Sequence, residues 1–421
     1  MSTVLSAPPT PARRGAGGLA VLSVTIGIFT IVTTEILPIG LLTSIADDFT
    51  ITDGMAGLMM TMPGLVAAVA APVVTVATAR IDRRRMLCLL IFLLMLANAL
   101  MAAAPCYWMV LLSRVLVGIT VGGFWSIAAG LAERLVAPES VGRANTVIFS
   151  SVPLGSVFGV PAGTFLGGLV GWRTTFATIG VLTAGVLALL ILVLPPLPAR
   201  QVTRVGVLRD LVRDLVRGTP TRIALLLTFL VVLAHFGAYT YVTPFLEQVT
   251  HVGPAAVTLL LLAYGGAGVL GNFLGGSAVR DHPRSTTTTA VALSAAAMLL
   301  LPLLGRWDVG ALVLLLVWGV GYGAVPVSTQ AWFARAAPAA PEAASVLFTA
   351  SFQATISFGA LLGGVAVDRT SPSTVLVLGG SVSGLAVLTV AAHIGSGRTL
   401  DHYPRGNRPA PTDRAGSADD R

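Results

Sequence analysis

Long apolar runs, separated by short polar segments, recur along almost the whole chain of 421 residues. A membrane-spanning helix needs about 20 consecutive apolar residues. A helix also satisfies its own backbone hydrogen bonds, as a lipid environment requires. The pattern therefore predicts an all-α membrane protein with twelve transmembrane helices, near residues 19–43, 55–79, 86–105, 107–133, 144–168, 173–195, 222–247, 254–279, 286–305, 309–335, 343–367 and 373–394.

The composition argues against a soluble protein. Charged residues make up only 10% of the chain, whereas a soluble domain carries about 25%. The net charge of +8 would suit a nucleic-acid-binding protein, but the basic residues lie in short segments between apolar runs. A basic face on a folded domain is the pattern that nucleic acid requires. We therefore expect no nucleic-acid partner, and we expect membrane lipids around most of the surface.

The placement of arginine predicts how the chain is oriented. All 26 basic residues are arginines, and 22 of them lie before the first span, after the last span, or in alternate segments between spans and at the span ends that border them. Cytoplasmic segments of membrane proteins carry such a positive excess. Abundant alanine, glycine and arginine without lysine is typical of a GC-rich bacterial genome. We expect a multi-pass protein of a bacterial inner membrane, with both termini in the cytoplasm.

The two halves of the chain resemble each other. A shift of 200 residues sets Arg80 over Arg280 and Arg84 over Arg284, at corresponding spans. Two six-helix units joined by a long inner segment are typical of transporters that rock around a central site. We expect a cytoplasmic tail, an N-terminal six-helix bundle, a cytoplasmic linker with an amphipathic helix, a C-terminal six-helix bundle and a disordered cytoplasmic tail, over residues 1–18, 19–195, 196–221, 222–394 and 395–421.

Ionisable side chains inside the spans are candidates for proton coupling, because an unpaired ion in hydrocarbon costs several kcal/mol. Glu35 and Arg114 are both expected about 11 Å below the outer surface, at 1.5 Å per residue. One interpretation is a structural salt bridge. The other makes Glu35 a proton site whose pairing with Arg114 changes between two conformations. His235, near the middle of the seventh span, is a third candidate because histidine titrates near neutral pH, although it also suits a hydrogen-bonded interior position.

Amide and aromatic side chains within the spans are candidates for substrate binding. Amides that face lipid are unfavourable, so some of them are expected to line a cavity. Flat rings would suit a planar aromatic substrate, although aromatic residues near helix ends also anchor helices at the membrane interface. The predicted substrate-binding residues are Phe124, Trp125, Tyr239, Tyr241, Asn272, Tyr322, Gln330 and Gln353.

A stripe of glycines follows one face of the fifth span. Its members are spaced four residues apart: Gly155, Gly159, Gly163 and Gly167. Such spacing lets another helix backbone approach closely, and Pro161 favours a bend. Gly271 and Gly275 of the eighth span offer a matching stripe. The stripe is interpreted either as static packing or as a seam along which the two halves slide.

Several motifs resemble those of the major facilitator superfamily. The segment "ATARIDRRRMLCLL" at 77–90 is similar to a cytoplasmic-loop motif of that family, and "SRVLVGITVGG" at 113–123 is similar to its span-four motif. The segment "GSVFGVPAG" at 155–163 resembles the span-five motif of its proton-driven exporters. Within the superfamily the chain resembles the twelve-span drug:H⁺ antiporters of the DHA1 type, near the arabinose-permease-like and purine ribonucleoside efflux transporters.

The resemblance implies two six-helix bundles that open alternately to either side, and export driven by inward proton flow with Arg114 part of the coupling. It also implies that Asp82 and Arg83 belong to a conformational latch between the bundles. The loop motif departs from the family pattern here, because its usual glycine and aspartate fall on Thr75 and Ala79. Either Asp82 replaces that aspartate, or the latch is weaker than in the family.

These observations favour a secondary active transporter, in particular a proton-coupled exporter of a drug, nucleoside or sugar. Uptake or facilitated diffusion is the alternative within the same fold, and a membrane enzyme is a third possibility. The sequence contains neither a metal-ligand spacing nor a phosphate-binding "GxxxxGK[ST]" loop. We therefore expect no enzymatic activity, no cofactor and no metal, and a monomer whose partners are its substrate, protons and lipids.

Overall fold

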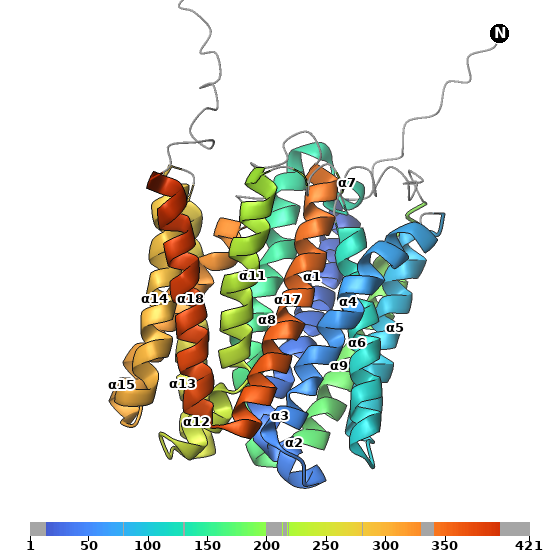
Figure 1. Ribbon diagram of the computed structural model, residues 1–421. Helices are drawn as coiled ribbons and strands as arrows, with labels where there is room; N and C mark the ends of the chain where they lie inside the picture. The colour runs from blue at the N-terminus through green and yellow to red at the C-terminus, as the bar shows by residue number, and fades with distance from the viewer. Residues whose placement is uncertain are drawn as a thin grey trace, which may run out of the picture.

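In the computed structural model, the described part of the chain is a bundle of helices (Figure 1). It comprises residues 14–78, 80–128, 131–198, 213, 217, 219–279, 281–329 and 341–395. Within these residues, 12 helices are long and apolar enough to cross a membrane. The predicted fold class is confirmed. Most of the predicted linker helix and C-terminal tail lie outside the described residues.

We call residues 14–198 the N-terminal half. Its first span differs from the prediction because the helix runs on from Gly17 to Phe49. Pro38 lacks a backbone N–H and falls in a short 3-10 segment within that run. The elements are α1 (Arg14–Ile36), η1 (Leu37–Leu41), α2 (Leu42–Phe49), α3 (Asp53–Ala56), α4 (Leu58–Ala77), α5 (Arg83–Ala102), α6 (Tyr107–Ala128), α7 (Ala132–Leu135), η2 (Pro138–Ser140), α8 (Val141–Val170) and α9 (Trp172–Val193).

We call residues 219–395 the C-terminal half. Four of its helices begin with proline, where a missing N–H is harmless, at Pro254, Pro283, Pro341 and Pro372. The elements are α11 (Thr219–Tyr239), α12 (Val242–Gln248), α13 (Pro254–Ala278), α14 (Pro283–Leu304), α15 (Asp308–Gly323), α17 (Pro341–Arg369) and α18 (Pro372–Gly395).

Helices of the two halves pack in matching pairs. The pairs α1 with α8, α4 with α6 and α5 with α9 in the N-terminal half correspond to α11 with α17, α13 with α15 and α14 with α18 in the C-terminal half. The contacts between the halves follow the same correspondence, in which α4 matches α13 and α8 matches α17. Helix α4 packs on α17, and α8 packs on α13. The internal similarity of the sequence therefore becomes a pseudo-twofold arrangement.

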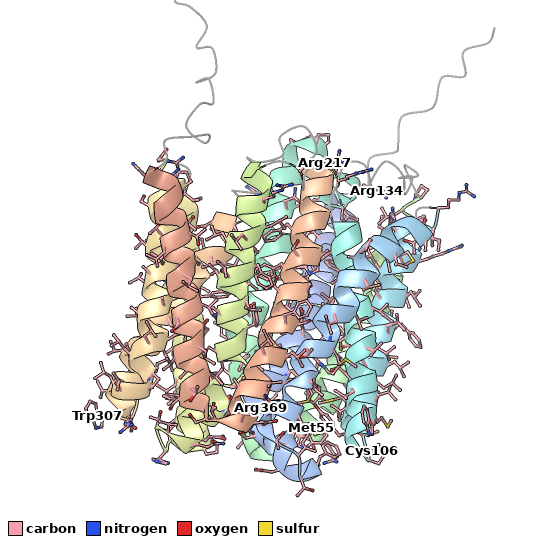
Figure 2. The ribbon with its side chains drawn as sticks, in the orientation of Figure 1. Met55, Cys106, Arg134, Arg217, Trp307 and Arg369 are labelled. Carbon is pink, nitrogen blue, oxygen red and sulfur yellow. The ribbon has the colours of Figure 1, made fainter. Side chains whose placement is uncertain are left out.

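The two ends of the bundle carry the residues that the arginine pattern separates. Arg134 and Arg217 lie at one end, and Met55, Cys106 and Arg369 lie at the other (Figure 2). We call the second the outer end, because the sequence predicts that it faces away from the cytoplasm. Segments α2, α3 and α12 lie at this end (Figure 1).

The outward surface of the bundle is apolar. Val181, Leu192 and Phe273 are 74%, 81% and 71% exposed. A soluble protein rarely exposes so many large apolar side chains together, whereas a lipid-facing surface requires them. These side chains provide the surface of a multi-pass membrane protein.

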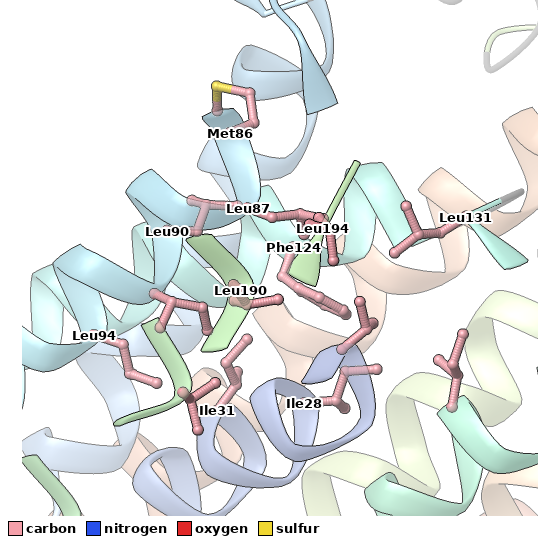
Figure 3. Close-up of a cluster of buried hydrophobic side chains, with 14 of the residues drawn as sticks. Ile28, Ile31, Met86, Leu87, Leu90, Leu94, Phe124, Leu131, Leu190 and Leu194 are labelled. Atoms are coloured by element: carbon pink, nitrogen blue, oxygen red, sulfur yellow. The ribbon is translucent and has the colours of Figure 1, made fainter. Parts of the chain in front are cut away.

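Apolar clusters hold each half together and also join the halves. One cluster lies within the N-terminal half, where Ile28, Leu90 and Phe124 pack together (Figure 3). A second cluster joins Ile39 and Val160 of the N-terminal half to Val242, Phe245 and other residues of the C-terminal half. The halves therefore share a continuous core next to α12, near the outer end.

Close helix packing in the C-terminal half depends on glycine at position 271. A Cβ atom there would meet the backbone of Val320 on α15 at less than 3.0 Å. We expect Gly271→Ala to lower the free energy of unfolding by about 1 to 3 kcal/mol, the usual cost of overpacking. A Cβ at Gly266, on the same helix, would have no neighbouring atom within 4 Å, so Gly266→Ala is the matched control. Thermal unfolding in detergent measures both, and equal midpoints would contradict this account of the packing.

Candidate functional site

Arg114 joins three helices of the N-terminal half. Its side chain, on α6, is 1% exposed. The guanidinium donates to the main-chain oxygens of Thr34, Glu35 and Met59, at 3.0, 2.7 and 3.0 Å. Arginine presents donors in a rigid planar fork, so one side chain satisfies carbonyls of both α1 and α4. The positive charge is therefore held by backbone dipoles.

The Glu35 carboxylate faces the other half of the molecule. Its Oε1 accepts a hydrogen bond of 2.8 Å from Nε2 of Gln353 on α17. The expected direct ion pair with Arg114 is not formed between these two described side chains, because the guanidinium is already occupied by carbonyl oxygens. Arg114 therefore fixes the backbone of Glu35, while Gln353 holds its carboxylate. The contact between α1 and α17 crosses from one half to the other.

An amide beside this network stabilises α1 from a third helix. Asn98 on α5 donates to the Thr34 hydroxyl at 3.3 Å and to the Leu94 carbonyl at 3.0 Å. The Oδ1 atom of Asn98 and the hydroxyl of Thr33 are buried without a partner in the described structure. Buried polar atoms are paired in the great majority of cases, so these atoms are suited to bind water or a polar ligand group.

His235 lies in a cluster of aromatic rings within the C-terminal half. Its ring stacks on Tyr322 with centroids 3.2 Å apart and on Tyr239 with centroids 5.2 Å apart. Trp318 lies edge-on at 5.4 Å, and Tyr264 stacks on Tyr239 at 4.7 Å. Helices α11, α13 and α15 supply these rings. The sequence did not indicate Tyr264 and Trp318, although both occur in apolar spans near Gly265 and Gly319.

Three polar atoms of this ring cluster are buried without a hydrogen-bond partner in the described structure. They are Nδ1 of His235, Nε1 of Trp318 and the hydroxyl of Tyr322. Each unpaired buried group costs about 1 to 3 kcal/mol. The ring faces cover one another in this structure, so a ligand that pairs with these atoms has to separate the stacked rings.

The other predicted substrate-binding residues are spread over the molecule. Phe124 is buried in the core of the N-terminal half and packs edge-on against Trp125 at 6.0 Å. Tyr241 lies near the outer end, where its hydroxyl donates to the Ala360 carbonyl at 2.7 Å. Asn272 is half-buried on α13. Gln330 lies outside the described residues.

The glycine stripe of α8 does not face α13, so the predicted match with Gly271 and Gly275 is wrong. A Cβ at Gly155 or Gly159 would meet Val32, Thr33 or Ile36 of α1. Because α8 is rotated so that its glycines face α1, a different side of α8 faces the C-terminal half. On that side, Val157 of α8 packs against Gly265 of α13. The remaining members of the stripe, which contact Leu37 and Leu41, are Gly163 and Gly167. Pro161 is buried within α8.

Among the described residues, the contacts of Asp82 are with its own half. Its carboxylate caps α5 by accepting from the backbone N–H of Arg84 at 2.8 Å, and it also accepts from Leu197 N–H at 2.9 Å. Arg83 donates to the Thr78 carbonyl at 3.3 Å. Neither residue forms a recorded hydrogen bond with the C-terminal half, so the expected contact between the bundles is absent here for these described residues.

The halves are joined instead by polar contacts at the outer end. The Thr243 hydroxyl donates to the Ile39 carbonyl at 2.9 Å, and Gln248 donates to the Asp53 carboxylate at 3.0 Å. Asp368 accepts from groups of the N-terminal half as well. Sequence reasoning missed these residues because a polar residue near a helix end is ordinary in a membrane protein.

Metal-binding chemistry finds no support in the described residues. They contain no group of three or more histidine, cysteine, aspartate or glutamate side chains that could hold an ion. The ionisable groups of the interior are instead distributed singly, as Glu35, Arg114 and His235. Each is held by hydrogen bonds or by aromatic rings.

Comparisons with known proteins identify the family. The model of the Major Facilitator Superfamily matches residues 24–352, and the chain belongs to this superfamily of membrane transporters. It is 34% identical over 365 residues to the "Transcription regulatory protein OpdE" of Pseudomonas aeruginosa, covering 87% of this chain and 90% of that protein. It is 31% identical over 398 residues to the "Purine ribonucleoside efflux pump NepI" of Escherichia coli strain K12, covering 91% and 97%.

Solved structures show the same fold at low sequence identity. A bacterial homologue of the human lysosomal transporter Spinster, in an inward-facing and unoccupied conformation, superposes with a TM-score of 0.72 at 16% identity. The match covers 90% of this chain and 96% of that one. The chain is therefore a major facilitator transporter, and a protein of this class binds a small-molecule substrate.

The three carbonyl contacts of Arg114 require a side chain with several separate N–H donors, and this requirement can be tested. A lysine ammonium is compact and cannot reach carbonyls of two helices through separate nitrogens. We expect Arg114→Lys to lower the free energy of unfolding by about 2 to 3 kcal/mol, the scale of a lost hydrogen bond to a buried charge. Thermal unfolding in detergent measures the effect, with the exposed Arg85→Lys as control. Identical stabilities of the two variants would refute the tie between the helices.

Proposed function

We propose that the protein is a proton-coupled exporter of a small organic molecule in a bacterial inner membrane. The observation that carries this proposal is the hydrogen bond between the Glu35 carboxylate and Gln353, which joins the two halves inside the membrane. A titratable group in that position links a proton to the relative placement of the halves. Transport by alternating access needs such a link, because protons must move the same equilibrium that moves the substrate.

The chemistry of the contact explains how the link works. An ionised carboxylate accepts a stronger hydrogen bond than a neutral acid does. Proton binding to Glu35 therefore weakens its hold on Gln353 and favours separation of α1 from α17. Arg114 keeps the Glu35 backbone in place during this exchange, because its contacts are with main-chain oxygens. The proton thus changes a contact between halves without loosening the N-terminal half.

His235 is the second proposed proton-coupling residue, and it lies in the aromatic cluster of the other half. Its Nδ1 atom is buried and unpaired, so a substrate or a proton bound there competes for the same atom. Competition between substrate and proton for one atom would let the two ligands bind alternately, which is the behaviour of an antiporter.

The proposed substrate is a planar molecule with hydrogen-bonding groups. The stacked rings of His235, Tyr239 and Tyr322 and the unpaired Nε1 of Trp318 support this choice. The efflux relative is named for purine ribonucleosides, which combine a flat ring with several polar groups. Purine ribonucleosides are therefore the first compounds to test, ahead of sugars and antibiotics.

Glu35→Gln tests the proton link directly. The amide still accepts a hydrogen bond from Gln353 but cannot bind or release a proton, so we expect pH-gradient-driven uptake of inosine into inverted membrane vesicles to fall at least about tenfold, as loss of an essential acid-base group does. Exchange of labelled for unlabelled inosine at equal pH should persist. Glu139→Gln, at an exposed inner position, is the matched control. Full gradient-driven uptake in Glu35→Gln would exclude this residue from coupling.

The same vesicles decide between export and the alternative of uptake or facilitated diffusion. In an exporter, an inward proton gradient across the cell membrane drives substrate outward, which corresponds to accumulation in inverted vesicles. A facilitator equilibrates the substrate and ignores the gradient. The direction of net flux therefore separates the two proposals without any mutation.

Tyr322→Phe tests the substrate site. Removing the unpaired hydroxyl should raise the KM for inosine about tenfold if the substrate pairs with it, since a lost hydrogen bond is worth about 1.4 kcal/mol. The midpoint of thermal unfolding should stay the same or rise, because a buried unpaired group is lost. Ser383→Ala removes another buried unpaired hydroxyl on α18 and serves as control. An unchanged KM in Tyr322→Phe would exclude the hydroxyl from substrate binding.

A further inference from the structure

We propose that Asp368 is the latch that holds the outer end of the transporter closed. Asp368 is the second-last residue of α17, in the C-terminal half. Its Oδ2 atom accepts from the Thr52 hydroxyl at 2.7 Å, and its Oδ1 atom accepts from the Gly54 backbone N–H at 2.8 Å. Both donors belong to the N-terminal half. The inference rests on the proposed alternating access, because a latch matters only in a protein that opens on this side.

The local sequence of the N-terminal half is built to receive this carboxylate. Thr52 caps α3 by accepting from the Met55 N–H at 3.1 Å, while its own proton goes to Asp368. A Cβ at Gly54 would lie closer than 3.0 Å to the Asp368 carboxylate and to the Gly364 carbonyl. The glycine therefore lets α17 approach the α3 backbone closely enough for the N–H to donate.

Within the described residues, both hydrogen bonds of the Asp368 carboxylate cross between the halves. The described hydrogen bonds of Asp82, which caps α5, stay within its own half. The Asp368 bonds exist only while the halves are together at this end, so they stabilise the closed state alone. A contact made in one of two states shifts the equilibrium between them.

Two other contacts close the same seam at the outer end, and one of them differs from the Asp368 contacts in being buried. The Thr243 contact with Ile39 is buried, and Gln248 shares the exposed setting of Asp368 in binding Asp53. The bonds of Asp368 are exposed, so water can replace them when the halves part. An exchangeable pair of bonds to a charged group suits a latch that must open in every cycle.

A cysteine reporter measures opening of the outer end without any substrate. The native thiols are removed by Cys88→Ala and Cys106→Ser, and Val242→Cys is introduced. Val242 is 0% exposed in the core that the halves share, on α12, which contacts η1 and α2. The rate of modification by a membrane-impermeant maleimide added outside intact cells then reports how often this core opens outward.

We expect Asp368→Ala to raise the labelling rate about tenfold, because two hydrogen bonds to a charged group are lost from the closed state alone. Asp368→Asn should give a smaller rise, since the amide oxygen still accepts from Gly54. Asp48→Ala is the matched control. Asp48 is an exposed aspartate of the same end, and its 2.5 Å ion pair with Arg173 stays within the N-terminal half. Its removal should leave the labelling rate unchanged.

Thr52→Val supplies a second test of the same contact. If Thr52 and Asp368 act through one hydrogen bond, the double variant Thr52→Val with Asp368→Ala should raise the logarithm of the labelling rate by less than the sum of the two single variants. An unchanged labelling rate in Asp368→Ala, with a normal midpoint of unfolding, overturns the latch. If the alanine variant fails to reach the membrane, Asp368→Asn decides: a faster rate supports the latch and an unchanged rate overturns it.

The experiments test the latch and the proposed proton coupling independently, so either hypothesis can be rejected while the other stands. Labelling of Val242→Cys needs neither inosine nor a proton gradient. Faster labelling in Asp368→Ala together with gradient-driven uptake in Glu35→Gln would support the latch and reject Glu35 as the coupling group. The reverse result would reject the latch alone.

Discussion

The exclusion of unpaired polar groups from hydrocarbon governs the arrangement of this protein. Lipid offers no hydrogen bonds, so the backbone must be helical and each interior polar side chain needs a partner. Arg114 meets this demand with three carbonyl oxygens, and Glu35 meets it with an amide of the other half. These polar contacts therefore tie particular helices together, alongside the apolar clusters that hold each half and join the halves.

The polar contacts between the halves are of two kinds, those inside the membrane span and those exposed to water at the outer end. The Glu35 contact lies within the membrane span, where a change of protonation alters the bond strongly because water is scarce. The Asp368 contact lies at the outer end, where water competes for the same groups. The first contact is suited to sense a proton, and the second is suited to open and close. In the proposed mechanism these properties belong to separate contacts, and helix α17 contributes a residue to both of them.

Much of the fold could be predicted from the sequence, and less of the site. Span number and pairing of the halves follow from apolar length and internal similarity, which are local properties of the chain. The sequence left the pairing of Glu35 with Arg114 open, because depth in the membrane does not show that carbonyl oxygens occupy the guanidinium or that Gln353 binds the carboxylate. The partner of the glycine stripe was wrong because helix rotation depends on all neighbours at once.

The sequence by itself determined the class of structure. A chain with 10% charged residues and twelve long apolar runs has to lie in a membrane as helices, since hydration and hydrogen bonding leave no other arrangement. Tertiary structure alone decided that Gln353 binds Glu35, that His235 lies among Trp318 and tyrosine rings, and that Asp368 reaches Gly54. These contacts join residues far apart in the chain, and their formation depends on helix rotation and the approach of two halves, which no local pattern encodes.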